Sequence, residues 1–190
     1  MPEFNEARIR LVNECSIDPK GTYVLYWMQM YRRLTCNHAL DYAMKQAVNL
    51  KKPLVIYEGL KLNYPWANAR IHTFILEGMK ENALQAKQLG INYWPFVETV
   101  SNSGKGLVHS LASRACLVVT DDFPQFIVPA QTEALARKVD VAVYTVDSNG
   151  IIPLSMLGQP TTAAMHLRRR IHKLFATAWR YRSHNFPQLT

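Results

Sequence analysis

The feature that most constrains the fold of this chain is its alternation of short apolar runs with longer amphipathic segments. The first run, Tyr23–Met28, reads YVLYWM and contains no charged residue. An apolar run of this length is typical of a strand that is buried on both faces, as in a parallel sheet. We expect four further strands, at Pro53–Tyr57, Ile91–Val97, Cys116–Thr120 and Val141–Val146.

Helical patterns separate these strands. In the range Asn37–Leu50, which Thr35 or Asn37 could cap, one helical face collects Leu40, Ala43, Met44 and Ala47. Further helices are expected at Ala67–Leu89, Leu107–Arg114, Thr132–Lys138 and Thr161–Arg180. Repeated alternation of strand and helix predicts an α/β fold: a five-stranded, parallel, doubly wound, Rossmann-like sheet with helices on both faces.

The chain of 190 residues is long enough for one well-packed domain and short for two. We expect an irregular arm at residues 1–20, the α/β domain at 21–160, and a basic helix at 161–190 that leads into a linker. No apolar run approaches the roughly 20 residues of a membrane span, and the N-terminus lacks the apolar segment of a secretory signal. Three scattered cysteines, Cys15, Cys36 and Cys116, favour a reduced, cytoplasmic compartment over a disulfide framework.

The formal net charge is +8, from 22 Lys and Arg against 14 Asp and Glu. This balance favours an anionic partner, either nucleic acid or a phosphorylated cofactor, although a solvated basic face gives the same count. Much of the excess lies in the last expected helix, whose apolar stripe is Leu167, Ile171, Leu174 and Ala178. Its candidates for contact with DNA or another domain are Arg168, Arg169, Arg170 and Lys173.

The turn between the first strand and its helix carries Arg32 and Arg33 and faces the crevice where open α/β sheets bind ligands. It lacks both G-x-G-x-x-G and G-x-x-x-x-G-K-[ST], so the usual phosphate loops are absent. A planar ligand needs aromatic or thioether walls and a few polar groups. The residues expected to bind it are Trp27, Met28, Gln29, Arg33, Asn37, Asp121, Asp122, Asp147 and Asn149.

Other interpretations of these residues stay open. Trp27 and Met28 could belong to the core. The three aspartates could form a divalent-metal or acid–base cluster, although Asp after a strand more often forms a turn or caps a helix. None of the six histidines has the spacing of a zinc site. Cys36 and His38 lie two residues apart, and such positions do not face each other on a helix.

Several motifs resemble one family. The run YVLYWMQMYRRLTCNHAL is similar to the first strand and turn of class II DNA photolyases and close photolyase-related proteins. In that family the strand ends in Tyr-Trp-Met before an Arg-containing turn and Asn-x-Ala-Leu. The matching residues are Tyr26, Trp27, Met28, Arg33, Asn37, Ala39 and Leu40. Similar stretches follow in the same order at Tyr64–Arg70, Val118–Asp121, Val146–Asp147, Ile152–Pro153 and Arg168–His172.

The resemblance implies the N-terminal α/β half of a light-driven DNA repair enzyme that splits cyclobutane pyrimidine dimers. It implies a larger helical domain, in cis or in trans, that holds FAD and receives the flipped dimer from damaged DNA. The α/β half of such enzymes often carries an antenna chromophore, a deazaflavin or a folate, at the strand ends. The chain departs from the family at Met30-Tyr31, where many members have Arg-Asp, and at Cys36, where they have Asp.

By itself the chain is expected to bind an antenna chromophore at most, because no residue in it can be assigned to FAD. We therefore expect no dimer splitting from the chain alone. Two other functions stay open: a non-enzymatic nucleotide- or flavin-binding module of Rossmann-like architecture, and a chromophore-free interaction domain. The missing phosphate loop counts against the nucleotide-binding module.

Overall fold

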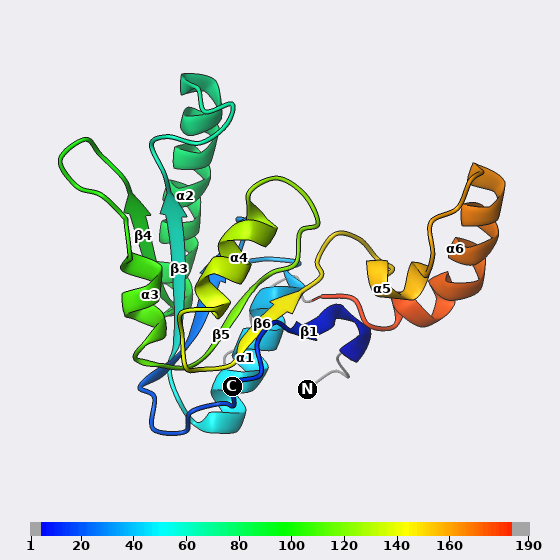
Figure 1. Ribbon diagram of the computed structural model, residues 1–190, viewed down its shortest axis with the longest axis horizontal. Helices are drawn as coiled ribbons and strands as arrows, with labels where there is room; N and C mark the ends of the chain where they lie inside the picture. The colour runs from blue at the N-terminus through cyan, green and yellow to red at the C-terminus, as the bar shows by residue number, and fades with distance from the viewer. Residues whose placement is uncertain (1–4, 184–190) are drawn as a thin grey trace.

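The computed structural model describes residues 5–183. Within this range the sheet has six strands in the order β1-β6-β5-β2-β3-β4 (Figure 1). They are β1 (Ile9–Leu11), β2 (Tyr23–Met28), β3 (Leu54–Leu60), β4 (Asn92–Val97), β5 (Ala115–Asp121) and β6 (Val143–Val146). Strands β2 to β6 pair in parallel, whereas β1 pairs antiparallel with β6. The predicted five-stranded parallel sheet is confirmed, with one antiparallel strand added at its edge.

Helices cover both faces of the sheet. The helices of residues 5–183 are the 3₁₀ turn η1 (Glu6–Arg8), α1 (His38–Leu50), α2 (Ala69–Leu89), α3 (Leu107–Ala112), α4 (Val128–Ala136), α5 (Leu154–Leu157) and α6 (Ala164–Trp179). Side chains of β2 alternate between the faces, so Tyr26 and Met28 pack with α1 in one core cluster. Leu25 and Trp27 pack in a second cluster with residues of α3 and α4. This arrangement confirms the doubly wound α/β fold.

Two helix ends follow the sequence signals. At the start of α1, Asn37 Oδ1 accepts hydrogen bonds from the N–H groups of Ala39 and Leu40, as one of the two candidate caps would. At the end of α2, Gly90 has a φ of 67°. Glycine adopts this left-handed conformation without a Cβ clash, and it ends the helix there.

Besides the short helix α5, which was not expected, two segments depart from the expected secondary structure. The arm, predicted to be irregular, holds strand β1, in which Ile9 lies opposite Val146. A strand of three residues is too short to show a period-two pattern in the sequence. Strand β3 runs on through Leu60 because residues 58–60 pair with residues 95–97 of β4, although the sequence predicts that this strand ends at Tyr57. The domain boundaries at residues 20 and 160 remain predictions.

The N-terminal segment also contacts the segment that precedes α5. Arg8 is 2% exposed, and its guanidinium donates to Asp147 O at 2.8 Å and to Ile151 O at 2.6 Å. Burial lowers the pKa of this guanidinium, and the nearby Asp147 carboxylate opposes that shift. Ser155 Oγ donates to Ala7 O in the same region. The 3₁₀ turn η1 is therefore tied to α5 and to the segment that precedes it.

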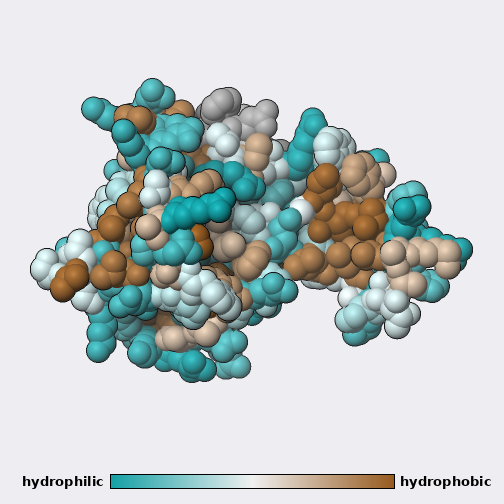
Figure 2. Space-filling model, turned by 90° about the horizontal axis from the view of Figure 1, so that it is seen from above, coloured by the Kyte–Doolittle hydropathy of each residue, from teal (hydrophilic) through white to brown (hydrophobic). Residues whose placement is uncertain are grey.

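Helices α5 and α6 stand off from the sheet (Figure 1). The main contact of α6 among the helices and strands is α5, and its predicted apolar stripe turns inward at the buried Ala178. A second apolar row stays exposed, at 56% for Met165, 43% for Phe175 and 45% for Trp179. Figure 2 shows apolar side chains gathered over this part of the molecule. The predicted linker falls mainly on residues 184–190, outside the described range.

Candidate ligand site at the carboxyl edge of the sheet

The predicted crevice lies where the connections that follow two neighbouring strands turn to opposite faces of the sheet. Strands β2 and β5 are neighbours, yet the helix after β2 packs on one face and the helix after β5 packs on the other. The two connections therefore diverge, and the carboxyl ends of β2 and β5 face the space between them. Residues 29–37 and 122–127 border this point.

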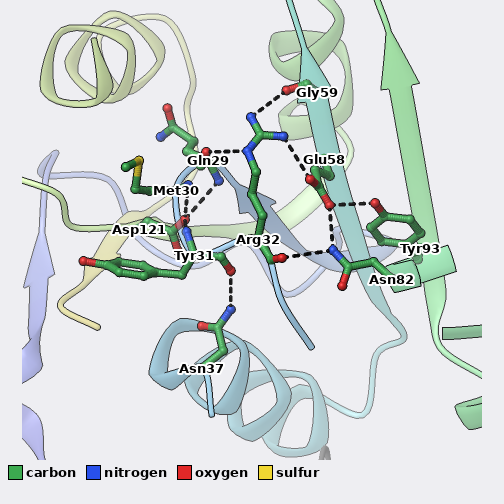
Figure 3. A network of polar contacts seen from close by, with 10 residues as sticks. All are labelled: Gln29, Met30, Tyr31, Arg32, Asn37, Glu58, Gly59, Asn82, Tyr93 and Asp121. Atoms are coloured by element: carbon green, nitrogen blue, oxygen red, sulfur yellow. Dashed lines mark hydrogen bonds and ion pairs between the residues drawn. The ribbon is translucent and has the colours of Figure 1, made fainter. Parts of the chain in front are cut away.

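The turn after β2 is built on one buried carboxylate, that of Asp121 (Figure 3). Its Oδ2 accepts hydrogen bonds from three consecutive backbone N–H groups, at 3.0 Å from Gln29, 2.6 Å from Met30 and 3.0 Å from Tyr31. Its Oδ1 accepts from the Tyr26 hydroxyl at 2.8 Å. Burial raises the pKa of the Asp121 carboxyl, and these four donors oppose that shift. The neighbouring strand thus fixes the turn through one side chain.

Asn37 holds the far end of the same turn. Its Nδ2 donates to the Tyr26 hydroxyl at 2.9 Å and to Tyr31 O and Arg33 O at 3.0 Å each. Asn37 is 1% exposed, so a side chain predicted to bind a ligand is occupied within the protein. Arg33 is exposed, and its guanidinium donates to Cys36 O at 3.1 Å while lying over the Tyr31 ring.

A second polar network, missed by the sequence interpretation, supports the turn from β3 (Figure 3). Arg32 Nη1 lies 2.9 Å from Glu58 Oε1, and Arg32 Nη2 donates to Gly59 O at 3.1 Å. Glu58 Oε2 accepts from Asn82 Nδ2 at 3.0 Å and from the Tyr93 hydroxyl at 2.6 Å. Glu58 is 0% exposed. The available signal was an acidic residue after one strand and an arginine after its neighbour, because carboxyl ends of parallel strands meet at one edge.

Gln29 presents a buried acceptor at the end of β2. Its Nε2 donates to Thr120 Oγ1 at 2.8 Å and to Thr132 Oγ1 at 2.9 Å, which links β5 to α4. Its Oε1 is buried and has no hydrogen-bond partner among residues 5–183. Figure 3 shows this amide pointing away from the Arg32 network. An unsatisfied buried acceptor costs about 1–3 kcal/mol, so a ligand N–H placed here would be stabilising.

The carboxyl ends of β5 and β6 bring Asp122, Asp147 and Asn149 together. Asn149 Nδ2 donates to Asp122 O at 2.9 Å and to Asp147 Oδ1 at 2.8 Å, and the Tyr31 hydroxyl donates to Asn149 Oδ1. The Asp122 carboxylate lies 3.3 Å from Arg10 Nη2. These carboxylates act as turn formers and as one surface ion pair. Among the residues that the structure describes, no group of three Asp, Glu, His or Cys is placed to hold a metal ion.

The structure places Trp27 and Met28 in the core, the alternative that the sequence left open. Met28 is 0% exposed and Trp27 is 8% exposed. Exposed aromatic surface at this edge comes instead from Trp66 and Phe126, whose rings stack with centroids 5.5 Å apart. Their loops follow β3 and β5, the two strands that flank β2. Both residues have positive φ, 68° and 64°, which is uncommon for bulky side chains and gave no sequence signal.

Hollows lie at both ends of the parallel strands. One of about 260 Å³ lies at the carboxyl edge, lined by Asp121, Asp122, Phe123, Thr132 and Thr145 among others. Another of about 400 Å³ lies at the amino ends of β2, β3 and β4, lined mainly by apolar groups that include Tyr23 and Trp94. The larger hollow is therefore not at the predicted site. We favour the smaller one for a ligand because it is lined by Asp121, the residue that fixes the polar turn.

The fold defines a class: a Rossmann-like α/β domain, with the candidate site at the carboxyl ends of its parallel strands. Sequence comparison gives the family. The chain is 33% identical over 151 residues to the deoxyribodipyrimidine photo-lyase of Methanothermobacter thermautotrophicus, a match that covers 80% of this chain. It is 27% identical to the photo-lyases of Potorous tridactylus, over 89% of the chain, and Arabidopsis thaliana, over 88%. The chain belongs to the photolyase family, as an N-terminal α/β domain.

The chain spans about a third of the length of these photo-lyases, 33%, 32% and 35% in the same order. No family model matches it. Similar solved structures include a universal stress protein from Burkholderia pseudomallei, at 18% identity and a TM-score of 0.38 over 70% of this chain and 97% of that one. Another is a universal stress protein in complex with cAMP, at 19% identity and the same TM-score, over 67% and 99%. These likenesses are too weak to bear on function.

No helix within residues 5–183 combines the length and the apolar character that crossing a membrane requires.

Proposed function

We propose that this chain is the antenna domain of a class II-like photolyase and binds a planar chromophore, a deazaflavin or a folate, at the carboxyl edge. In this proposal, splitting of cyclobutane dimers in damaged DNA by light-driven electron transfer from reduced FAD belongs to a helical domain, in cis or in trans. The observation that carries the chromophore site is the buried Gln29 Oε1, which has no donor within residues 5–183. Membership of the photolyase family supports the repair context.

The groups at this edge fit a planar ring better than a flavin dinucleotide. In this proposal a ring N–H donates to Gln29 Oε1 after the ligand displaces the groups that bury it, and the Trp66–Phe126 stack offers an aromatic face that is 76% exposed at Trp66. The backbone donors that a pyrophosphate would use at the turn already bond Asp121. When bound, the chromophore supplies light absorption. The chain itself binds and orients the ring and keeps water from the Gln29 amide.

Helix α6 is the second contact that we propose, and its partner is the helical FAD domain. Phe175 and Trp179 stack with centroids 5.5 Å apart on its exposed side, and an apolar patch of this kind is typical of an interface. Arg170 is occupied, because its guanidinium donates to Leu157 O at 2.8 Å and ties α6 to α5. The basic residues that stay exposed for DNA or domain contact are Arg168, Arg169 and Lys173.

Titration with a phosphate-free deazaflavin tests the chromophore site. We expect a saturable shift of the ligand's visible absorption band in the wild-type chain. Gln29→Ala should weaken binding about tenfold, the effect of losing one hydrogen bond worth about 1.4 kcal/mol. Gln88→Ala, which changes an exposed glutamine on α2, serves as the control and should bind as the wild type does. The absence of any band shift at about 1 mM ligand would contradict the proposal, since it bounds the binding free energy.

A repair assay separates the chain from the parent activity. Purified chain with added FAD and blue light should leave cyclobutane dimers intact, because no FAD site is assigned to it. Dimer splitting by the chain alone would contradict the proposal that this reaction belongs to a helical domain. A folded chain that binds a photolyase helical domain but no chromophore would favour the interaction-domain alternative instead.

A further inference from the structure

The turn after β2 has the geometry of an anion-binding loop. Three successive N–H groups, of Gln29, Met30 and Tyr31, converge on one oxygen at 2.6 to 3.0 Å. Consecutive backbone N–H groups that point at one centre form the concave sites in which proteins bind phosphate and other anions. Here that centre is the Asp121 carboxylate, which is 1% exposed. The anion is thus part of the chain and comes from the neighbouring strand, β5.

The other donors expected for a phosphate at this point are also taken. The first N–H groups of a helix commonly bind phosphate, but those of Ala39 and Leu40 bond Asn37 Oδ1 at 3.0 and 3.1 Å. The Arg32 guanidinium is engaged with Glu58 and Gly59 O. A phosphate brought to this turn would meet a buried negative charge and would find its usual donors bonded.

We propose that the turn of residues 29–31 is an anion site permanently filled by Asp121, and that Asp121 makes the crevice selective for phosphate-free ring ligands over phosphate-bearing ones. The choice of a ring ligand rests on the proposed function. The filled anion site does not rest on it, because its donors and its occupant are all residues of this chain.

Two flavins that share one ring test the selectivity. Riboflavin carries no phosphate and FMN carries one, so their affinities differ only through that group. We expect the wild-type chain to bind riboflavin at least about tenfold more tightly than FMN. Asp121→Asn removes the charge and keeps the shape of the side chain, so the affinities of this variant for the two flavins should differ less. Equal affinity of the wild type for the two flavins, or tighter binding of FMN, would overturn the selectivity.

Refilling the site with a small carboxylate tests the anion site itself. Asp121→Ala should melt below the wild type, and sodium formate should raise its melting temperature by at least about 3 °C over sodium chloride at equal ionic strength. The wild type, Asp121→Asn and Asp122→Ala should show no such difference, since in each of them the site stays filled. The same formate effect in all four proteins, or none in Asp121→Ala, would overturn the anion site.

The two tests fail separately. If neither flavin binds the wild type, the chromophore proposal and the selectivity fall together, while the formate experiment still decides the anion site. If riboflavin binds but formate has no specific effect, the chromophore proposal stands and the anion site falls. Asp121→Ala could fail to fold in sodium chloride. In that case, refolding of the variant from urea in sodium formate alone supports the anion site, and failure to refold in either salt overturns it.

Discussion

The turn after β2 and helix α6 differ in how many of their polar and apolar groups are hydrogen-bonded or packed within the chain. Around the turn, the buried carboxylates of Glu58 in β3 and Asp121 in β5 have several hydrogen-bond partners each. On α6, large apolar side chains such as Phe175 and Trp179 stay exposed. The turn is therefore complete in this chain, whereas α6 carries a face suited to another surface. Substitutions in the turn should change the stability of the isolated chain, and substitutions on α6 should act mainly on association.

High pH should give the largest difference between the sheet with its turn and helix α6, because it should destabilise the sheet more. Burial raises the pKa of Tyr42 and Tyr57 to about 12 and that of Tyr26 well above its usual range. A phenol whose pKa is higher in the folded state stabilises the fold fully below its unfolded value, about 10. That stability is lost as the pH rises through the folded value. Helix α6, residues 164–179, has no tyrosine.

We therefore expect unfolding of the sheet between about pH 10 and about pH 12, since these limits are the unfolded and folded pKa values. Tyrosinate absorbance and circular dichroism should change together. Tyrosine ionisation complete at pH values where the circular dichroism is still native would show that these phenols are not held by the fold, and would break the comparison.

Arg32→Ala tests the network under the turn. It leaves the Glu58 carboxylate buried without its cation, and breaking a buried pair in this way costs about 3–5 kcal/mol. Because Arg32 keeps 24% of its side chain exposed, we expect the lower end of that range in urea denaturation. Arg33→Ala is the matched control on the next residue, which is exposed and should cost less than about 1 kcal/mol. Equal losses for the two variants would contradict the assignment.

Tyr26→Phe tests the link between β2 and the turn. It removes the hydroxyl that donates to Asp121 Oδ1 and accepts from Asn37 Nδ2, so each buried partner loses one hydrogen bond. The expected loss of unfolding free energy is about 1–3 kcal/mol. Tyr181→Phe, near the end of α6, provides a comparison with the same chemical change. A loss from Tyr26→Phe no greater than from Tyr181→Phe would show that the bonds at the turn contribute little.

Phe175→Ala should have the smallest effect on the isolated chain. Its ring is 43% exposed, so truncation should cost less than about 1 kcal/mol, against about 2–5 kcal/mol for Leu40→Ala in the core. Binding of the chain to a photolyase helical domain, measured by calorimetry, should weaken in Phe175→Ala. A large loss of stability without any change in binding would place the ring in the core of the chain and reverse the comparison.

The parts of the fold that follow from local chemistry could be predicted from the sequence. Strand β2 is predicted to the residue because a strand buried on both faces must be apolar throughout, and α1 begins where Asn37 supplies a cap. Strand β1 could not be predicted, since three residues carry no period. The continuation of β3 was missed because Glu58 in a sequence does not reveal that Arg32, Asn82 and Tyr93 will surround it.

The candidate site divides in the same way. Asp121 at the end of a strand marks the edge where the site forms, and the sequence places it there. Its pairing with three backbone N–H groups depends on how two strands and a turn meet, which no local pattern encodes. Trp27 and Met28 were predicted to line the site because an aromatic and a thioether side chain suit a planar ring. Both are buried instead, because a central strand has core on both of its faces. Trp66 and Phe126 reach the edge through left-handed backbone that only the folded loops reveal.

Strand β1 and Arg8 have a practical consequence for work on this protein. The first described residues are bonded to the segment from which the C-terminal helix departs. We therefore expect trimming or tagging the chain near its start to alter the direction in which that helix projects, more than a hundred and fifty residues later in the sequence. An affinity handle attached there could weaken recognition of a partner while leaving the sheet intact, and would be mistaken for a defect in the helix itself.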